Sequence, residues 1–87
     1  MAQKAARLYD AGKPCGAEAN AAKLLGGRAG HAACQQAMFT LGGMGYAKEY
    51  QVERLLREVL ITRIAPVSEQ LILSFIAEKV LDQPKSY

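Results

Sequence analysis

A glycine-rich turn between two helical patterns is the feature that most limits how this chain can fold. Residues 41–46 read LGGMGY; they end one long helical pattern and precede a second, amphipathic one. Glycine reaches backbone conformations that side chains forbid, so paired glycines after a helix commonly stop it. Amphipathic helices joined by short connections of this kind pack as an antiparallel bundle.

Helical periodicity predicts four helices, near residues 2–11, 15–41, 48–63 and 67–81. Pro66 separates the last two, because proline disfavours helical geometry at the preceding residue. No segment alternates polar and apolar residues as a strand does, so the fold class is all-α, an antiparallel helical bundle. The apolar face of the third and fourth helices should be buried: Val52, Leu55, Leu56, Val59, Leu60, Leu71, Ile72, Phe75 and Ile76.

Local details of the helices also follow from spacing. Two pairs of opposite charge in the third helix are separated by four residues and should support it: Glu53 with Arg57, and Arg54 with Glu58. Ser68 suits the N-cap of the fourth helix. The glycines at 26, 27 and 30 either permit close approach of another helix or mark a local break.

Composition bounds what the chain can be. Its 87 residues make one small domain, and 51% of them are apolar, more than short helices can cover alone. Some of that surface should face other chains or domains. The net charge of +3 comes from scattered basic residues, which argues against a nucleic-acid partner.

Targeting signals and metal motifs are lacking in the sequence. The N-terminal residues lack an apolar signal core, and the apolar run at 71–77 is too short to cross a bilayer. We therefore expect a cytoplasmic protein with no membrane partner. Cys15 and Cys34 have no second pair nearby, and His31 has no ligand cluster, so we expect no metal site and no disulfide.

Several motifs occur in a fixed order along the chain. They are a D-x-GK corner beginning at Asp10, an EA…AKLL helix beginning at Glu18, the LGGMGY turn followed by EYQVER, and RIAPVSEQLIL. This order resembles the C-terminal helical domain of flavin-dependent acyl-CoA dehydrogenases. The resemblance implies that residues 1–87 are that domain, a fragment of a longer enzyme whose N-terminal and middle domains lie outside these residues.

The resemblance implies which residues contact the cofactor. In the family, the turn at Gly42 and Gly43 approaches the adenosine-diphosphate part of a flavin held mainly by a neighbouring subunit. Phe39 stands where the family has a glutamine, and an apolar or stacking contact could replace the lost hydrogen bond. Ser68 and Gln70 align with a threonine and a glutamine that contact the flavin. The alternative is that Ser68 only caps a helix and Gln70 is only exposed.

The resemblance also implies that the catalytic base is not among these residues. Pro66 occupies the position of the catalytic glutamate of many family members, and proline has no titratable group. The resemblance implies that the base comes from an earlier helix. Glu69 is three residues further on, and we interpret it as a solvated first-turn glutamate. His31 lacks a nucleophile partner and should be a surface or partly buried helical residue.

The implied function is α,β-dehydrogenation of an acyl-CoA thioester with FAD as electron acceptor. The expected partners are the acyl-CoA substrate, an electron-transfer flavoprotein and further copies of the chain in a dimer or tetramer. The 87 residues alone should neither hold FAD nor be active. The alternative is a stand-alone α-helical oligomerisation or interaction module without catalytic activity.

Overall fold

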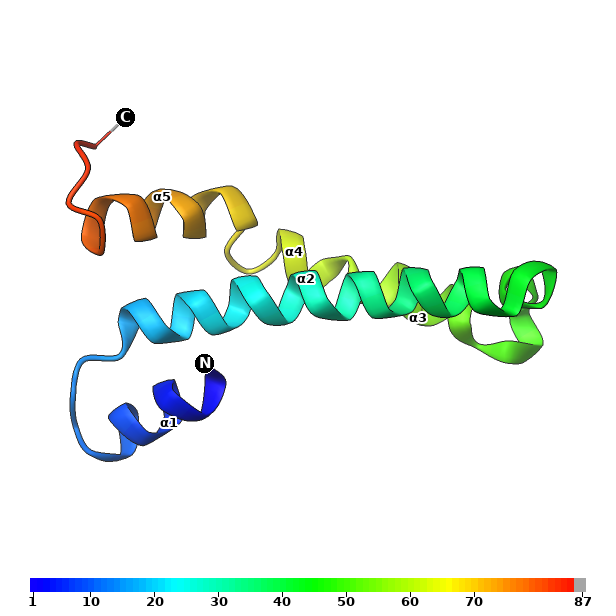
Figure 1. Ribbon diagram of the computed structural model, residues 1–87, viewed down its shortest axis with the longest axis horizontal. Helices are drawn as coiled ribbons and strands as arrows, with labels where there is room; N and C mark the ends of the chain where they lie inside the picture. The colour runs from blue at the N-terminus through cyan, green and yellow to red at the C-terminus, as the bar shows by residue number, and fades with distance from the viewer. Residues whose placement is uncertain (86–87) are drawn as a thin grey trace.

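The computed structural model describes residues 1–85, and within them every regular element is a helix (Figure 1). The α-helices are α1 (Ala2–Asp10), α2 (Gly16–Leu41), α3 (Val52–Val59), α4 (Ile61–Ile64) and α5 (Glu69–Lys79). Two 3-10 helices, η1 (Gly42–Tyr46) and η2 (Lys48–Tyr50), connect α2 to α3. The predicted all-α class is confirmed.

The 26-residue helix α2 is the axis of the molecule. It runs from one end of the structure to the other, and α1, α3 and α5 pack against it in the opposite direction (Figure 1). The result is an elongated body of 46 × 33 × 19 Å. The helices lie alongside α2 rather than around a central core.

Glycines at positive φ end the first two helices. Gly12 (φ +67°) follows α1, where its N–H donates to the Tyr9 carbonyl oxygen at 2.9 Å. Gly42 (φ +59°) follows α2. Because side chains make this backbone region costly, glycine is favoured at both stops. The first two predicted helices therefore agree with the structure to within one residue at each end.

The single helix predicted near 48–63 is wrong. Residues 48–50 form η2, and Gln51 takes a left-handed conformation (φ +64°) before α3 begins. A tightened turn at Leu60, where the Arg63 N–H bonds only three residues back at 3.1 Å, separates α3 from α4. The last helix, predicted near 67–81, spans Glu69–Lys79.

The predicted buried set is mostly wrong. Only Ile72 (1% exposed) is buried, whereas Leu55, Leu60 and Leu71 are 43%, 40% and 51% exposed. The other members are half-buried: Val52, Leu56, Val59, Phe75 and Ile76. The reason is the arrangement of the helices, since each outer helix covers only the side that faces α2. The remaining apolar faces stay open.

The segment Val52–Lys79 is long and apolar enough, by length and composition alone, to cross a membrane. A transmembrane helix needs its backbone hydrogen bonds to continue without a gap. Here the helix ends at Ile64, and the backbone is extended at Ala65 and again at Ser68 before α5 begins. Length and composition are therefore weak evidence of a span in this chain.

Candidate functional site

The C-terminal end of α2 carries three of the predicted cofactor contacts. Gly42 closes the helix with its N–H directed to the Phe39 carbonyl oxygen. A Cβ atom added at Gly42 or at Gly43 would meet no heavy atom within 4 Å beyond the chain neighbours. The Phe39 side chain is 69% exposed. The backbone of this turn is thus open to a molecule from outside.

Gly45 in the same turn has the opposite surroundings. It is buried in η1, and a Cβ atom there would lie 2.7 Å from the carbonyl oxygen of Met38. Real Cβ atoms do not approach a backbone oxygen so closely, so the fold itself requires glycine here. Gly45 could not be predicted from the sequence, because spacing alone does not say which glycine of LGGMGY packs inward.

A hollow of about 580 Å³ lies beside this turn, between the end of α2, the two 3-10 helices and α3. Its lining is Met38, Tyr46, Lys48, Glu53, Leu56 and Arg57. The Arg57 Nε donates to Glu53 at 2.9 Å, and this bond raises the pKa of the guanidinium. Arg54 pairs with Glu58 at 2.7 Å, so both predicted pairs within the third helix are confirmed.

The segment between α4 and α5 and the first turn of α5 carry the other predicted contacts, Ser68 and Gln70. The Ser68 hydroxyl oxygen accepts a hydrogen bond from the Leu71 N–H at 3.3 Å, which confirms the predicted N-cap. Gln70 and Pro66 are exposed. This segment lies beside the N-terminal half of α2, whereas the glycine turn lies at its far end (Figure 1). The structure therefore places the predicted contact residues in two separate groups.

Glu69 is not the solvated glutamate that the sequence suggested. Its side chain is only 11% exposed and binds two arginines. One carboxylate oxygen accepts from Arg28 Nε on α2 at 2.7 Å, and the other accepts from Arg63 Nε on α4 at 2.8 Å. A second nitrogen of Arg63 lies 2.8 Å from His31 Nδ1 on α2. These four side chains form a polar cluster that joins three helices.

The protonation states in this cluster follow from the donors. A guanidinium only donates, so His31 must accept through Nδ1 and carry its proton on Nε2. Hydrogen bonds from Arg63, and then from Arg28, lower the pKa of the Glu69 carboxyl. Such a carboxylate is a poor proton acceptor, so Glu69 is unsuited to the role of a base.

Two of the three internal glycines of α2 permit close approach. A Cβ atom at Gly27 would lie 3.3 Å from the Thr62 carbonyl oxygen, and one at Gly30 would lie 3.1 Å from a Val59 methyl group. Gly26 faces open space, and the helix continues through all three without a break. Close approach is therefore the correct one of the two predicted alternatives for Gly27 and Gly30.

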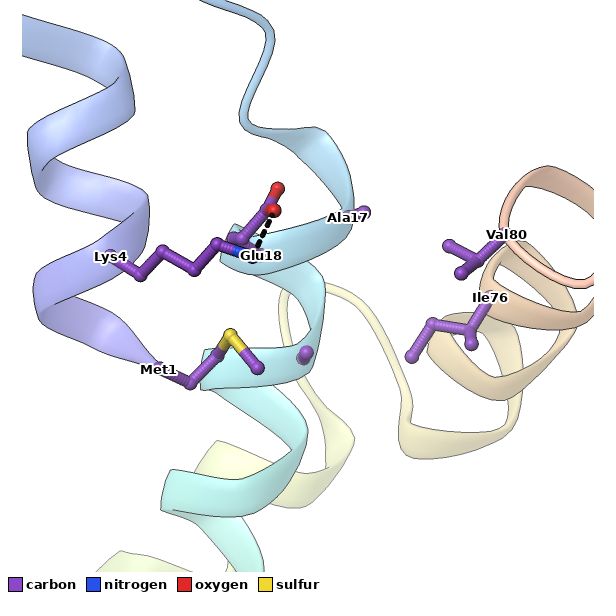
Figure 2. A pocket seen from close by; sticks show the side chains of 7 residues that line it. Met1, Lys4, Ala17, Glu18, Ile76 and Val80 are labelled. Carbon is purple, nitrogen blue, oxygen red and sulfur yellow. Dashed lines mark ion pairs between the residues drawn. The ribbon is translucent and has the colours of Figure 1, made fainter.

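At the opposite end of α2, a groove of about 220 Å³ separates α1 from α5. Figure 2 shows Met1 and Lys4 on one side of α2, and Ile76 of α5 and Val80, which directly follows α5, on the other. Lys4 pairs with Glu18 at 3.0 Å, and that hydrogen bond lowers the pKa of Glu18. The full lining is Met1, Lys4, Ala17, Glu18, Ala21, Ile76 and Val80. Apart from the ion pair, the groove is apolar.

Thiols and metal-binding groups add no further site among the described residues. Within residues 1–85, no group of three or more His, Cys, Asp or Glu side chains is placed to hold a metal ion. Cys15 and Cys34 are free and half-buried.

The family of the chain follows from comparison with known sequences. The family described as "Acyl-CoA dehydrogenase, C-terminal domain" matches residues 1–81. The chain belongs to this family. The helical fold and the glycine turn at the end of α2 agree with the assignment.

Curated relatives extend the comparison. Acyl-CoA dehydrogenase FadE12 of Mycobacterium tuberculosis is 43% identical over 89 aligned positions, which cover 100% of this chain and 23% of that protein. The short-chain specific mitochondrial acyl-CoA dehydrogenase of Bos taurus is 49% identical over 61 positions, covering 70% and 15%. The (2S)-methylsuccinyl-CoA dehydrogenase of Cereibacter sphaeroides is 40% identical over 73 positions, covering 84% and 13%. The chain thus spans less than a quarter of the length of these relatives. No solved structure matches it significantly.

Acyl-CoA dehydrogenases are FAD-dependent, and the residues of this domain fit contact with that cofactor. A Cβ atom at Gly42 or Gly43 would meet nothing within 4 Å, and the Phe39 side chain is exposed. The Ser68 oxygen accepts the cap bond, which leaves its O–H able to donate. The chemistry of each of the two groups is thus compatible with contact to a flavin.

Proposed function

We propose that this domain belongs to an FAD-dependent acyl-CoA dehydrogenase that carries out α,β-dehydrogenation of an acyl-CoA thioester. Membership of the family over residues 1–81 supports the proposal, as do relatives named for that activity. The complete enzyme extends beyond these residues, as its relatives do. It works in the cytoplasm and passes electrons to an electron-transfer flavoprotein.

The observation that carries the proposal is the open glycine turn at the end of α2. Gly43 makes no internal contact that a side chain would disturb, yet a glycine stands there. Gly42 needs its positive φ to stop the helix, but Gly43 has no such reason within the chain. A ligand that approaches the backbone closely supplies the missing reason.

Two groups of residues in this domain contact the cofactor. Gly42 and Gly43 let the backbone approach the adenosine-diphosphate part of FAD, and Phe39 adds an apolar or stacking contact. Ser68 and Gln70 offer hydrogen bonds from the second group. When bound, FAD supplies the hydride acceptor of the reaction.

Proton abstraction belongs to another part of the enzyme. Pro66 has nothing to titrate, and both carboxylate oxygens of Glu69 are occupied by arginines. We infer that the base lies on a helix outside these residues.

We also propose that the enzyme is a homo-oligomer, a dimer or tetramer. Large apolar side chains are exposed on several elements: Leu25, Leu41, Ile61, Ile64, Leu73 and Leu81. Single exposed apolar residues are ordinary, but among residues 1–85 the buried hydrophobic side chains are Ala5 and Ile72, so partners are expected to cover the exposed apolar surface. Sedimentation at micromolar concentration should therefore detect assembly of the full-length protein, and a clean monomer would contradict it.

The test of the function is FAD retention in the full-length protein. Gly43→Val should lower the flavin absorbance per protein by about tenfold, because a β-branched side chain then occupies the approach to the cofactor. Gly26→Val is the matched control: it adds the same side chain at a glycine that also faces open space. The control should retain its FAD.

Two results would contradict the proposal. An unchanged flavin content in Gly43→Val would mean that the turn only ends helix α2. A full-length protein that binds no FAD and oxidises no acyl-CoA would favour the alternative, a stand-alone α-helical interaction module. The isolated 87 residues should be colourless in either case, since they lack the other side of the flavin site.

A further inference from the structure

Residues 64–68, which comprise the last residue of α4 and the connection to α5, are tied to α2 on both sides. On the α4 side, Lys23 Nζ donates to the Thr62 carbonyl oxygen at 2.6 Å. On the α5 side, Arg28 of α2 binds Glu69 at 2.7 Å. Both ties come from a short stretch of α2, less than two helical turns long.

Glu69 is the centre of this arrangement. Arg63 immediately precedes the segment and Glu69 immediately follows it, and the two side chains bind each other at 2.8 Å. They close residues 64–68 into a loop. Arg63 is held in turn by His31 at 2.8 Å, so the loop is fastened to α2 through both of its closing residues.

Backbone hydrogen bonds tie the loop to its own two helices: the Ala65 N–H donates to the Ile61 carbonyl oxygen at 2.9 Å, and the Ser68 carbonyl oxygen accepts from the Ile72 N–H at 3.1 Å. Pro66 has no N–H to donate, and both Pro66 and Val67 are exposed. The backbone is extended at Ala65 and Ser68, so α4 ends at Ile64 and α5 begins only at Glu69. The side chains of Arg63 and Glu69 therefore fasten the loop to α2.

We propose that Glu69 is a positioning residue of the enzyme. Through Arg28 and Arg63, its carboxylate holds the loop against α2. That in turn sets where Ser68 and Gln70 meet the cofactor. The inference rests on the proposed function, and it gives Glu69 a role other than acid–base chemistry.

The variant that tests the proposal is Glu69→Gln in the full-length protein. Glutamine keeps the shape of the side chain but replaces one acceptor oxygen with an NH₂ group that faces an arginine. Misplacement of a contact by about 1 Å can cost on the order of 100-fold in rate, so we expect kcat to fall about 10- to 100-fold. KM should change by less than about threefold, because acyl-CoA contacts are not altered.

Glu58→Gln is the matched control. Glu58 pairs with Arg54 inside α3 and joins no two elements, so its loss should leave kcat and the flavin spectrum unchanged. A conservative rescue completes the set. Arg28→Lys keeps the positive charge beside Glu69 and should retain more activity than Arg28→Met. If Glu69→Gln fails to fold, the two Arg28 variants decide the outcome, because that side chain is half exposed.

A second measurement follows the loop directly. Spin labels at Val67→Cys and Gln35→Cys, with Cys15 and Cys34 replaced by serine, report the distance between the loop and α2. Both label positions are exposed. The distance distribution should broaden in Glu69→Gln and stay narrow in Glu58→Gln.

The outcomes separate the role of Glu69 from the function of the enzyme. An active wild-type flavoprotein with an unchanged Glu69→Gln variant overturns the positioning role alone. Broadened distances with unchanged kcat also overturn it, because the loop position then does not matter for turnover. A full-length wild type that takes up no FAD overturns the proposed function, and the role that rests on it.

Discussion

Gly27 and Gly30 in the middle of α2 and Gly42 and Gly43 at its end have opposite surroundings. A Cβ atom at Gly27 would press against α4 at 3.3 Å, and one at Gly30 would press against Val59 at 3.1 Å. At Gly42 and Gly43 the same atom would meet nothing within 4 Å. Gly27 and Gly30 therefore serve the packing of this chain. Of Gly42 and Gly43, only Gly42 has a role within the chain, because its positive φ ends the helix.

The ion pairs repeat this contrast. Arg57 and Glu53 lie one turn apart within α3, where such pairs support a helix only slightly. Glu69 instead joins three helices through partners 41 and 6 residues away. The middle of α2 thus makes contacts within this chain, whereas the far end of α2 is open to other molecules.

The largest expected effect is at Gly27. Gly27→Leu forces a side chain against the Thr62 carbonyl oxygen, which Lys23 also holds, so the free energy of unfolding should fall by about 1–3 kcal/mol. Gly26→Leu is the control next to it. With open space at Gly26, leucine should stabilise the helix by up to about 1 kcal/mol. Chemical denaturation of both variants measures the difference, and equal stabilities would contradict the packing role of the middle glycines.

A smaller loss is expected at Gly42. Its φ of +59° is costly for any residue with a Cβ, so Gly42→Ala should lower the free energy of unfolding by roughly 1–2 kcal/mol, although no neighbour is in the way. Gly42→Asn should lose about as much, because the ψ of Gly42 is −134°, outside the left-handed region that asparagine tolerates. If both variants keep the stability of the wild type in denaturation, backbone strain is not what glycine relieves at this stop.

Local signals explain the part of the fold that could be predicted. Gly12 and Gly42 mark the ends of α1 and α2 in the sequence, and the helices end there. Gln51 carries no such signal, so its left-handed conformation and the 3-10 turns before it were missed. Burial was also missed, because a periodic pattern finds an apolar face but does not say which helices will cover it.

The candidate site was predictable to a similar extent. The cap at Ser68 follows from residue type and position, and the structure has it. The partners of Glu69 do not follow from the sequence. Arg28 lies 41 residues away, and helical spacing relates only residues three or four apart. The open and closed glycines of LGGMGY also look alike in sequence, since only the Met38 backbone distinguishes Gly45 from Gly43.

Acid should weaken the contacts that Glu69 makes with the middle of α2, whereas a change of pH near neutrality should not. Arg63 and Arg28 hold the folded pKa of Glu69 below its ordinary value of 4.5. Above that value the carboxylate is ionised in both states, so its contribution to stability is complete. As the pH falls below it, the unfolded chain takes up the proton first, and the contribution is lost until the folded pKa is passed.

The measurement is the free energy of unfolding of wild type and Glu69→Gln from pH 7 down to pH 3. The gap between them should stay constant down to about pH 5 and then narrow. Glu18 and Glu78 also have lowered pKa values, so only the difference between the two proteins reports Glu69. A gap that stays constant to pH 3 would mean that the two arginines do not stabilise the ionised form.

The smallest expected effect on stability is at Gly43, and it sharpens the comparison most. Alanine there meets no neighbour and Gly43 has no positive φ, so Gly43→Ala should change the free energy of unfolding by less than about 0.5 kcal/mol. If the turn serves a cofactor, the same methyl group should still weaken FAD retention in the full-length protein, because it narrows the approach to the backbone. Denaturation and flavin absorbance of one variant therefore separate the two roles of glycine. A marked loss of stability would show that the fold requires glycine at position 43. Full stability together with full FAD would show that neither the fold nor the cofactor requires it.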